Sequence, residues 1–225
     1  MKTKRFLVAA LTLCMLLCIL PILGTPALAS DTPASDTKTG AMFTDVTAKD
    51  WFFKNVNFVC AAGLMNGTGG NKFSPHSTMT RGMMVTVLYR LSGDKGTYKS
   101  SFSDVASSAW YKNAVGWAAT NGISNGIGKN LFAPNSEVTR EQLAILFYNY
   151  AKYKKYDVTL DMESNLLSYN DAFTMFNEYN GKALRYVICE GIMTGDDKGN
   201  MNVKATASRA EVATMLRRFI ENAAN

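Results

Sequence analysis

The stretch GISNGIGKNLFAPNSEVTREQLAILF, residues 122–147, carries the signals that decide the fold. Its first glycine suits the left-handed position that stops a helix, and Asn125-Gly126 can form a tight turn. Thr139 has a hydroxyl able to cap free amides, and apolar residues at helical spacing follow it. The stretch therefore predicts the end of one helix, a glycine-rich loop, and a second helix that begins at Thr139.

The same signals occur three times along the chain. The first two copies are offset by 59 residues without an insertion, and the third is more divergent. In every copy the loop glycine and an arginine lie 18 positions apart: Gly63 and Arg81, Gly122 and Arg140, Gly191 and Arg209. Identical spacing indicates tandem repeats, for which we expect boundaries at 43–100, 101–160 and 161–225.

Each repeat is predicted to contain two helices, so the fold class should be mainly α, with three tandem helix-loop-helix units. The first helix should start near Trp51, Trp110 or Tyr179 and end at the glycine. In the second copy helical spacing predicts one packed face, made of Trp110, Ala114, Trp117 and Ala118. The second helix carries an apolar stripe that recurs in all copies: Met84, Val87, Leu88 and Leu91; Leu143, Leu146, Phe147 and Tyr150; Val212, Met215, Leu216 and Phe219.

Helix capping should differ among the copies. Ser208 and Glu211 match a capping box, in which each side chain bonds to the other residue's backbone amide. Thr139 and Gln142 come close to that pattern. Thr80 has a methionine at the matching position, so the first copy should have the weakest helix start.

The N-terminus has the features of a removable export signal. Lys2, Lys4 and Arg5 precede the apolar run 6–23, and Ala27-Leu28-Ala29 supplies a cleavage site. We expect a signal peptide over residues 1–29, a flexible leader over 30–42, and an exported product without a membrane segment. Since the signal holds three bases and no acid, its removal lowers the formal net charge from +6 to +3. That small charge argues against nucleic acid as a partner.

Histidine and cysteine usage excludes most catalytic and metal sites. A catalytic triad or a two-histidine zinc motif would have to be built around the single histidine, His76. Cys60 and Cys189 lie on the same kind of helix, each next to apolar residues, so we expect two buried free thiols. Nothing local supports a nucleophile that pairs either cysteine with His76, and no cofactor or metal is expected.

With the repeats aligned, the sequence resembles the S-layer homology domain family of bacterial surface proteins. Units of that family run Phe-x-Asp-Val, Trp, Gly, Phe-x-Pro and Thr-Arg-Ala-Glu, and the resemblance covers residues 43 to about 220. It implies a pseudo-threefold, three-pronged helical body with grooves between repeats. In that family the grooves hold an acidic secondary cell-wall polysaccharide, typically with a pyruvylated N-acetylmannosamine unit.

Carried across by position, the resemblance assigns the ligand-holding role to Arg81, Arg140 and Arg209. A guanidinium offers a planar fork to a carboxylate, and a helix start also favours anions. The alternative for each arginine is a solvated charge at a helix start, which triplication at one register disfavours. All three copies keep the arginine, but the first and second lack the Ala-Glu that follows it, and the third departs at the tryptophan and Phe-x-Pro positions. We therefore expect between one and three functional grooves.

Other residues complete the candidate polysaccharide site. Trp51, Trp110 and Tyr179 are expected mainly to anchor helix starts in the core, with stacking on a sugar face as the alternative. Asp45 and Asp104 are expected mainly to hold the groove loops, with contacts to sugar hydroxyls as the lesser alternative. The turn residues that would line the grooves are Asn66, Gly67, Asn125 and Gly126.

The sequence therefore favours a non-catalytic module that anchors a secreted protein to the bacterial cell wall. One alternative is a self-assembling or protein-interacting surface-layer component with a surface protein partner. Another is a wall-active glycan hydrolase, which needs two carboxylates across a cleft. Glu141, Glu190 and Glu211 are available for that chemistry, but none recurs as a pair.

Overall fold

The structure is a computed structural model that describes residues 42–159, 168–172 and 180–223. The expected signal peptide, almost all of the leader, and Tyr179 lie outside the described residues. Within the described part the chain forms six α-helices and a π-helical end: α2 Phe53–Ala61, α3 Arg81–Ser92, α4 Lys112–Thr120, α5 Arg140–Tyr153, α7 Gly181–Cys189, α8 Arg209–Arg218 and η3 Phe219–Ala223. The expected mainly α class, with helix-loop-helix repeats, is confirmed.

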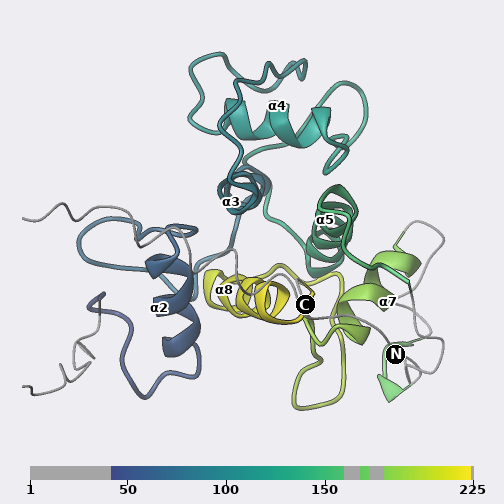
Figure 1. Cartoon of the computed structure of the whole chain (residues 1–225). Helices are drawn as coiled ribbons and strands as arrows, with labels where there is room; N and C mark the ends of the chain where they lie inside the picture. Colours follow the sequence, from purple (N-terminus) through teal and green to yellow (C-terminus); the bar gives the residue numbers. More distant parts are fainter. Residues whose placement is uncertain (1–41, 160–167, 173–179, 224–225) are drawn as a thin grey trace, which may run out of the picture.

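The repeats form a closed ring with pseudo-threefold symmetry. Figure 1 shows α3, α5 and α8 around the centre and α2, α4 and α7 on three outer prongs. The inner helix of each repeat packs on the outer helix of the next, as α3 on α4 and α5 on α7, and α8 closes the ring onto α2. Every repeat therefore buries part of its apolar surface against a neighbour.

A backbone hydrogen-bond triangle joins the three repeats at the centre. The Met79 amide donates to the Ala207 carbonyl (3.1 Å), the Val138 amide to Met79 (2.9 Å), and the Ala207 amide to Val138 (3.2 Å). These residues directly precede the three inner helices, and all are buried. Because buried peptide groups need partners, each repeat satisfies an amide and a carbonyl of its neighbours.

The inner helices begin as the sequence predicts. Ser208 with Glu211 and Thr139 with Gln142 form complete capping boxes. Thr80 only accepts a hydrogen bond from the Met83 amide, so the expected weakest cap is confirmed. The glycines that stop the outer helices have φ angles of +63° to +68°, as the left-handed position requires.

The first amides of each inner helix are used by a neighbouring repeat. The amides of Arg81 and Gly82 donate to the carbonyls of Ser136 and Pro134, each at 2.9 Å. The starts of α5 and α8 do the same to loops of repeats three and one. A ligand in a groove consequently meets the electrostatic field of the helix start, but these amide donors are already taken.

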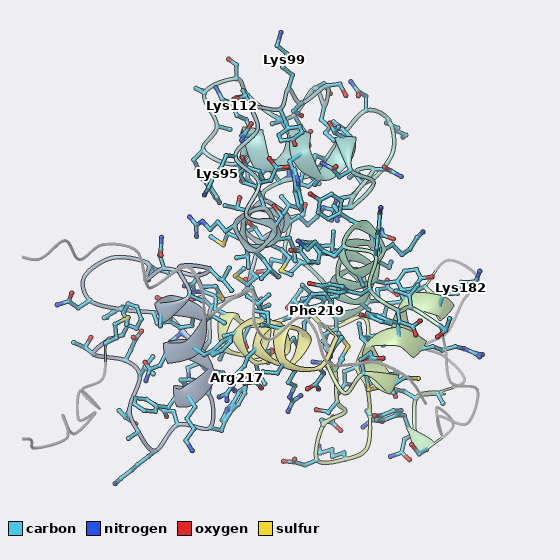
Figure 2. All side chains as sticks on the ribbon, in the orientation of Figure 1. Lys95, Lys99, Lys112, Lys182, Arg217 and Phe219 are labelled. Atoms are coloured by element: carbon cyan, nitrogen blue, oxygen red, sulfur yellow. The ribbon has the colours of Figure 1, made fainter. Side chains whose placement is uncertain are left out.

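The recurrent apolar stripes form the core. All their members are buried except Leu91, which is partly exposed. Figure 2 places Phe219 near the centre of the molecule, where its ring stacks on Phe147 with 5.0 Å between centroids. By contrast, Lys99 and Lys112 lie on the outer part of the α4 prong. Among the described residues, no helix combines the length and apolarity needed to cross a bilayer.

The expectation of two buried thiols is wrong. The two cysteines among the described residues are free, but Cys189 is exposed and Cys60 is half-buried. Partial burial raises the pKa of the Cys60 thiol to about 11. Aligned on the loop glycines, Cys189 corresponds to the exposed Ala61, one residue beyond the position of Cys60. A shift of one residue turns a helical side chain by about 100°, enough to move it from the core to solvent.

Candidate functional site

Three grooves lie between the repeats, and each contains one of the predicted arginines. The Arg140 groove has a volume of about 580 Å³, the Arg209 groove about 300 Å³, and the Arg81 groove about 260 Å³. Each combines the arginine of one repeat with the loop and inner helix of the following repeat. In the Arg140 and Arg209 grooves the remaining repeat adds a tryptophan, Trp51 and Trp110 respectively.

The arginines are fixed to the loops that they face. In each groove the Nε atom donates to a loop carbonyl: Arg81 to Phe132 (2.9 Å), Arg140 to Met201 (2.8 Å) and Arg209 to Phe73 (2.7 Å). A second bond runs from Nη2 of Arg140 to the Thr194 carbonyl (2.8 Å), and from Nη2 of Arg209 to the Asn66 carbonyl (2.6 Å). The corresponding Nη2 of Arg81 donates to the Ser124 hydroxyl at 3.4 Å.

These contacts overturn the alternative of a solvated charge at a helix start. The three arginines are only 6–8% exposed, and burial lowers the pKa of Arg140 and Arg209 below the ordinary arginine value. A guanidinium carries five N–H groups, of which the loop carbonyls take two in Arg140 and in Arg209. Further N–H groups on the terminal nitrogens can therefore donate to a ligand from a fixed position.

Aspartates hold the same loops from the other side. The Asp45 carboxylate accepts from the amides of Phe73 and Ser74, both at 2.8 Å, and Asp104 does the same for Phe132 and Ala133 at 2.8 and 2.7 Å. Although desolvation acts to raise it, the pKa of both carboxyls lies below its ordinary value, because the amides stabilise the charged form. The expected role of these aspartates in holding the groove loops therefore agrees with the hydrogen bonds.

The third repeat also has an aspartate that holds its groove loop, Asp171, which was not among the predicted site residues. Asp171 accepts from the amides of Met201 and Asn202, both at 2.8 Å. Its signal was the segment Tyr169-Asn170-Asp171-Ala172, which stands in the third copy where Phe-x-Asp-Val stands in the family's units. In each repeat the residue whose amide binds the aspartate also presents its carbonyl to an arginine, so aspartate, loop and arginine form one connected unit.

The tryptophans lie at the groove rims. Trp51 and Trp110 are each 63% exposed, and each ring meets the next aromatic residue edge to face, Phe52 at 5.2 Å and Tyr111 at 5.0 Å. For Trp51 and Trp110 the expectation of helix-start core anchors is wrong, because both rings are mostly exposed and Phe52, at 2% exposure, occupies the core position in the first repeat. The expected packed face of the second repeat holds for its members inside α4 but does not extend to Trp110.

The predicted turn residues line grooves in the positions expected from the repeats. Asn66 and Gly67 lie in the Arg209 groove, and Asn125 and Gly126 lie in the Arg81 groove. A Cβ atom on Gly67 would come within 2.6 Å of the Phe43 ring, so this glycine allows a close approach of the loop to the opening motif.

Two further arginines were missed. Arg90 lines the Arg209 groove and donates to the Leu64 carbonyl at 3.0 Å. Arg218 lines the Arg140 groove, where its Nη1 atom lies 3.3 Å from the Thr194 hydroxyl. Each stands nine residues after the first arginine of its inner helix, and Asn149 is the equivalent in the second repeat. Alignment of the inner helices to their ends would have found them.

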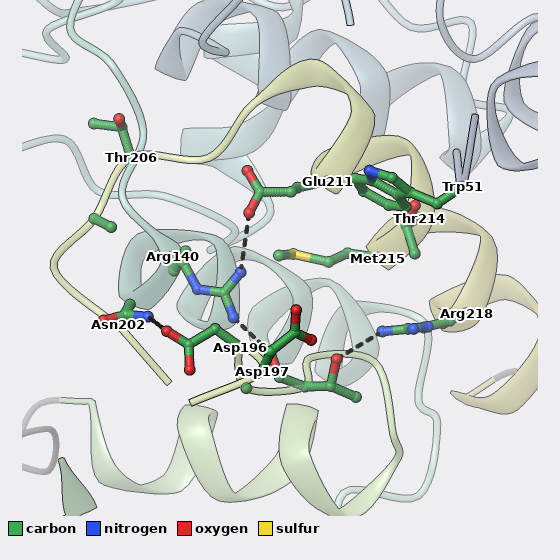
Figure 3. A pocket seen from close by; sticks show the side chains of 13 residues that line it. Trp51, Arg140, Asp196, Asp197, Asn202, Thr206, Glu211, Thr214, Met215 and Arg218 are labelled. Atoms are coloured by element: carbon green, nitrogen blue, oxygen red, sulfur yellow. Dashed lines mark hydrogen bonds and ion pairs between the residues drawn. The ribbon is translucent and has the colours of Figure 1, made fainter. Parts of the chain in front are cut away.

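Figure 3 shows how the Arg140 groove is assembled. Arg140 lies between Glu211 and the loop that carries Asp196, while Trp51 and Arg218 lie further along the same cavity. The Nη1 atom of Arg140 is 3.7 Å from a Glu211 carboxylate oxygen. Within the described ranges no group of three histidine, cysteine or acidic side chains is arranged to hold a metal ion. The groove can thus offer fixed cationic donors, carboxylate acceptors and an exposed aromatic face.

Comparisons with known proteins match the three repeats to one family of domains. The model of the S-layer homology domain matches residues 43–83, 101–144 and 169–213. A Surface-layer 125 kDa protein of Lysinibacillus sphaericus is 27% identical over 72% of this chain and 13% of its own length. An Amylopullulanase of Thermoanaerobacterium thermosulfurigenes is 31% identical over 81% of this chain and 10% of its own length. An Endoglucanase of Bacillus sp. (strain KSM-635) is 25% identical over 96% of this chain and 22% of its own length.

The chain therefore spans between about a tenth and a quarter of these relatives, each of which is a much longer protein. What they share with it is the region that contains the three repeats. This protein belongs to the S-layer homology domain family, as a cell-wall- or surface-associated member with three tandem domains.

Proposed function

We propose that this protein is a non-catalytic module that anchors to the cell wall by binding an acidic secondary cell-wall polysaccharide in its inter-repeat grooves. One observation carries the proposal. In two grooves a buried arginine, held by two loop carbonyls, shares the cavity with a tryptophan that is 63% exposed and comes from a different repeat.

The chemistry of these two groups fits a sugar that bears a carboxylate. The remaining guanidinium N–H groups can donate to the carboxylate in a charge-assisted pair. The indole can cover the apolar C–H face of the sugar ring, which removes apolar surface of both partners from water. A pyruvyl ketal on N-acetylmannosamine supplies both features, and it is the ligand unit that we propose.

The relatives support anchoring as the shared role. Proteins named as a surface-layer protein, an amylopullulanase and an endoglucanase have the same region in common, although their names describe different tasks. A module that attaches its carrier to the wall would serve all of them. Because the chain spans only a small part of each relative, their catalytic activities are not transferred to it.

Sedimentation with purified cell walls tests the proposal. Trp51→Ala combined with Trp110→Ala removes two exposed rings, so the variant should fold normally and lose about tenfold or more in wall affinity. Met42→Ala, which shortens an exposed side chain that lines none of the described grooves, is the matched control. Walls stripped of their secondary polymer should fail to retain the unaltered protein. Full retention on stripped walls would refute the polymer as ligand.

A further inference from the structure

The grooves share one plan but differ in charge. Beside its two arginines, the Arg209 groove is lined by Met83, Thr86 and other uncharged residues, and no carboxylate is among the described residues that line it. The Arg140 groove also holds two arginines but adds three carboxylates: Asp196, Asp197 and Glu211. An acidic sugar would meet a net positive site in the first groove and several like charges in the second.

One helix position accounts for the difference in charge close to the buried arginine of each groove. It is the third residue of each inner helix: Met83 in α3, Gln142 in α5 and Glu211 in α8. These residues line the Arg209, Arg81 and Arg140 grooves respectively. In the Arg140 groove the Glu211 carboxylate already lies 3.7 Å from Arg140 Nη1, where a ligand carboxylate would have to approach.

Glu211 cannot easily move aside. Its Oε2 atom accepts from the Ser208 amide at 2.7 Å and from the Ser208 hydroxyl at 2.8 Å. The capping box therefore keeps the carboxylate in place beside Arg140. Asp196 is also fixed, because it accepts from the amides of Asn200 and Lys198 and from the Asn202 side chain.

The Arg81 groove lies between these two in charge. It is lined by one arginine and by Asn149 where the other grooves have a second arginine. Its one carboxylate, Glu141, is paired with Lys204 Nζ at 2.7 Å. The order of preference for an acidic ligand then runs from the Arg209 groove through the Arg81 groove to the Arg140 groove.

We propose that the Arg209 groove is the principal site for the carboxylate-bearing sugar, and that the residue at position 83, 142 or 211 sets how strongly each groove accepts that charge. The inference rests on the proposed function, since it assumes that the grooves bind the wall polymer. It adds which groove binds the acidic unit and which side chain decides it. Arg90 then acts as the second cation of this site, which an alignment of the Thr-Arg motif alone does not select.

Isothermal titration of the mature protein with a pyruvylated N-acetylmannosamine glycoside tests this assignment, and the methyl ester of the same glycoside serves as the uncharged twin. Met83→Glu should weaken the tightest binding event for the acid about tenfold and leave the ester nearly unchanged. Met83→Gln is the matched control: it changes shape without adding charge, so any loss of affinity that it causes should be the same for the acid and for the ester. Both variants add a partner to the Thr80 cap, so neither should unfold the helix start.

The reciprocal change sharpens the test. Glu211→Gln removes the charge beside Arg140 but keeps the box, as the Thr139 and Gln142 pair does. It should raise the affinity of a weaker site for the acid. Trp110→Ala should abolish the tightest event, whereas Trp51→Ala should spare it.

The outcomes separate the two proposals. If the unaltered protein binds neither glycoside, the proposed function fails. If it binds the acid but Met83→Glu has no effect, or Trp51→Ala rather than Trp110→Ala removes the tightest event, the groove assignment alone is overturned.

Discussion

The floor and the rim of the Arg140 and Arg209 grooves are tied to the fold in different ways. Arg140 and Arg209, on the floor, are buried and donate to carbonyls of the next repeat in the ring. Trp51 and Trp110, on the rim, are mostly exposed and touch a neighbouring aromatic ring. The difference teaches that a floor residue joins repeats as well as facing the groove, whereas a rim residue can change without disturbing the assembly.

The largest expected effect comes from the floor. Arg209→Ala removes the donors to the Phe73 and Asn66 carbonyls and breaks a link between repeats three and one. It should lower the free energy of unfolding by about 2–4 kcal/mol, measured by urea denaturation. Arg209→Lys keeps the positive charge but not the planar guanidinium, so its free energy of unfolding should fall by less. If the free energy of unfolding of Arg209→Ala equalled that of the unaltered protein, the floor would contribute as little to the fold as the rim.

A smaller effect is expected from the aspartates that support the floor. Asp104→Asn weakens the two bonds from the Phe132 and Ala133 amides, at a cost of about 1–2 kcal/mol. Because the folded-state pKa of Asp45 and Asp104 is depressed, these groups stabilise the native protein at pH above about 4. That contribution is lost as the pH falls through the folded pKa. Unfolding measured from pH 6 to pH 3 should therefore show a shallower loss in Asp104→Asn, and an identical pH profile would contradict this role.

The smallest effect on stability is expected at the rim. Trp51→Ala and Trp110→Ala together should change the free energy of unfolding by no more than about 0.5 kcal/mol, since most of each ring is in water. Phe52→Ala, at the buried neighbouring position, is the contrasting control and should cost about 3–5 kcal/mol. Thermal melts of the three proteins provide the measurement. If the tryptophan pair melted as early as Phe52→Ala, the rim residues would matter to the fold as much as a core residue does.

Local sequence patterns predicted where the helices begin and end, but they misplaced a residue that lies just before a helix start. The caps at Thr139 and Ser208 and the stop at Gly122 were predicted correctly, because each depends on residues within one turn. Trp110 was counted on the packed face of a helix that begins only at Lys112. Before that point the 3.6-residue period does not apply, so the neighbouring Tyr111, and not Trp110, packs against the core.

The candidate site was predictable only in part. The registers of Arg81, Arg140 and Arg209 follow from the repeat alone. That these side chains are buried and bonded to loop carbonyls does not, because their partners lie between 51 and 143 residues away in sequence. Arg90 and Arg218 were overlooked because the motif that carries the resemblance ends near the helix start.

By itself the sequence determined the number of repeats, the order of helix, loop and helix, the caps, and one arginine at the same point of each copy. These features depend on spacing within a segment, which the chain carries wherever the segment lies. Only the tertiary structure decided that the repeats close into a ring, that each groove draws an arginine and a loop from successive repeats, and that Met83 and Glu211 give two similar grooves different charge. Those outcomes depend on contacts between distant residues, whose free energy no local pattern contains.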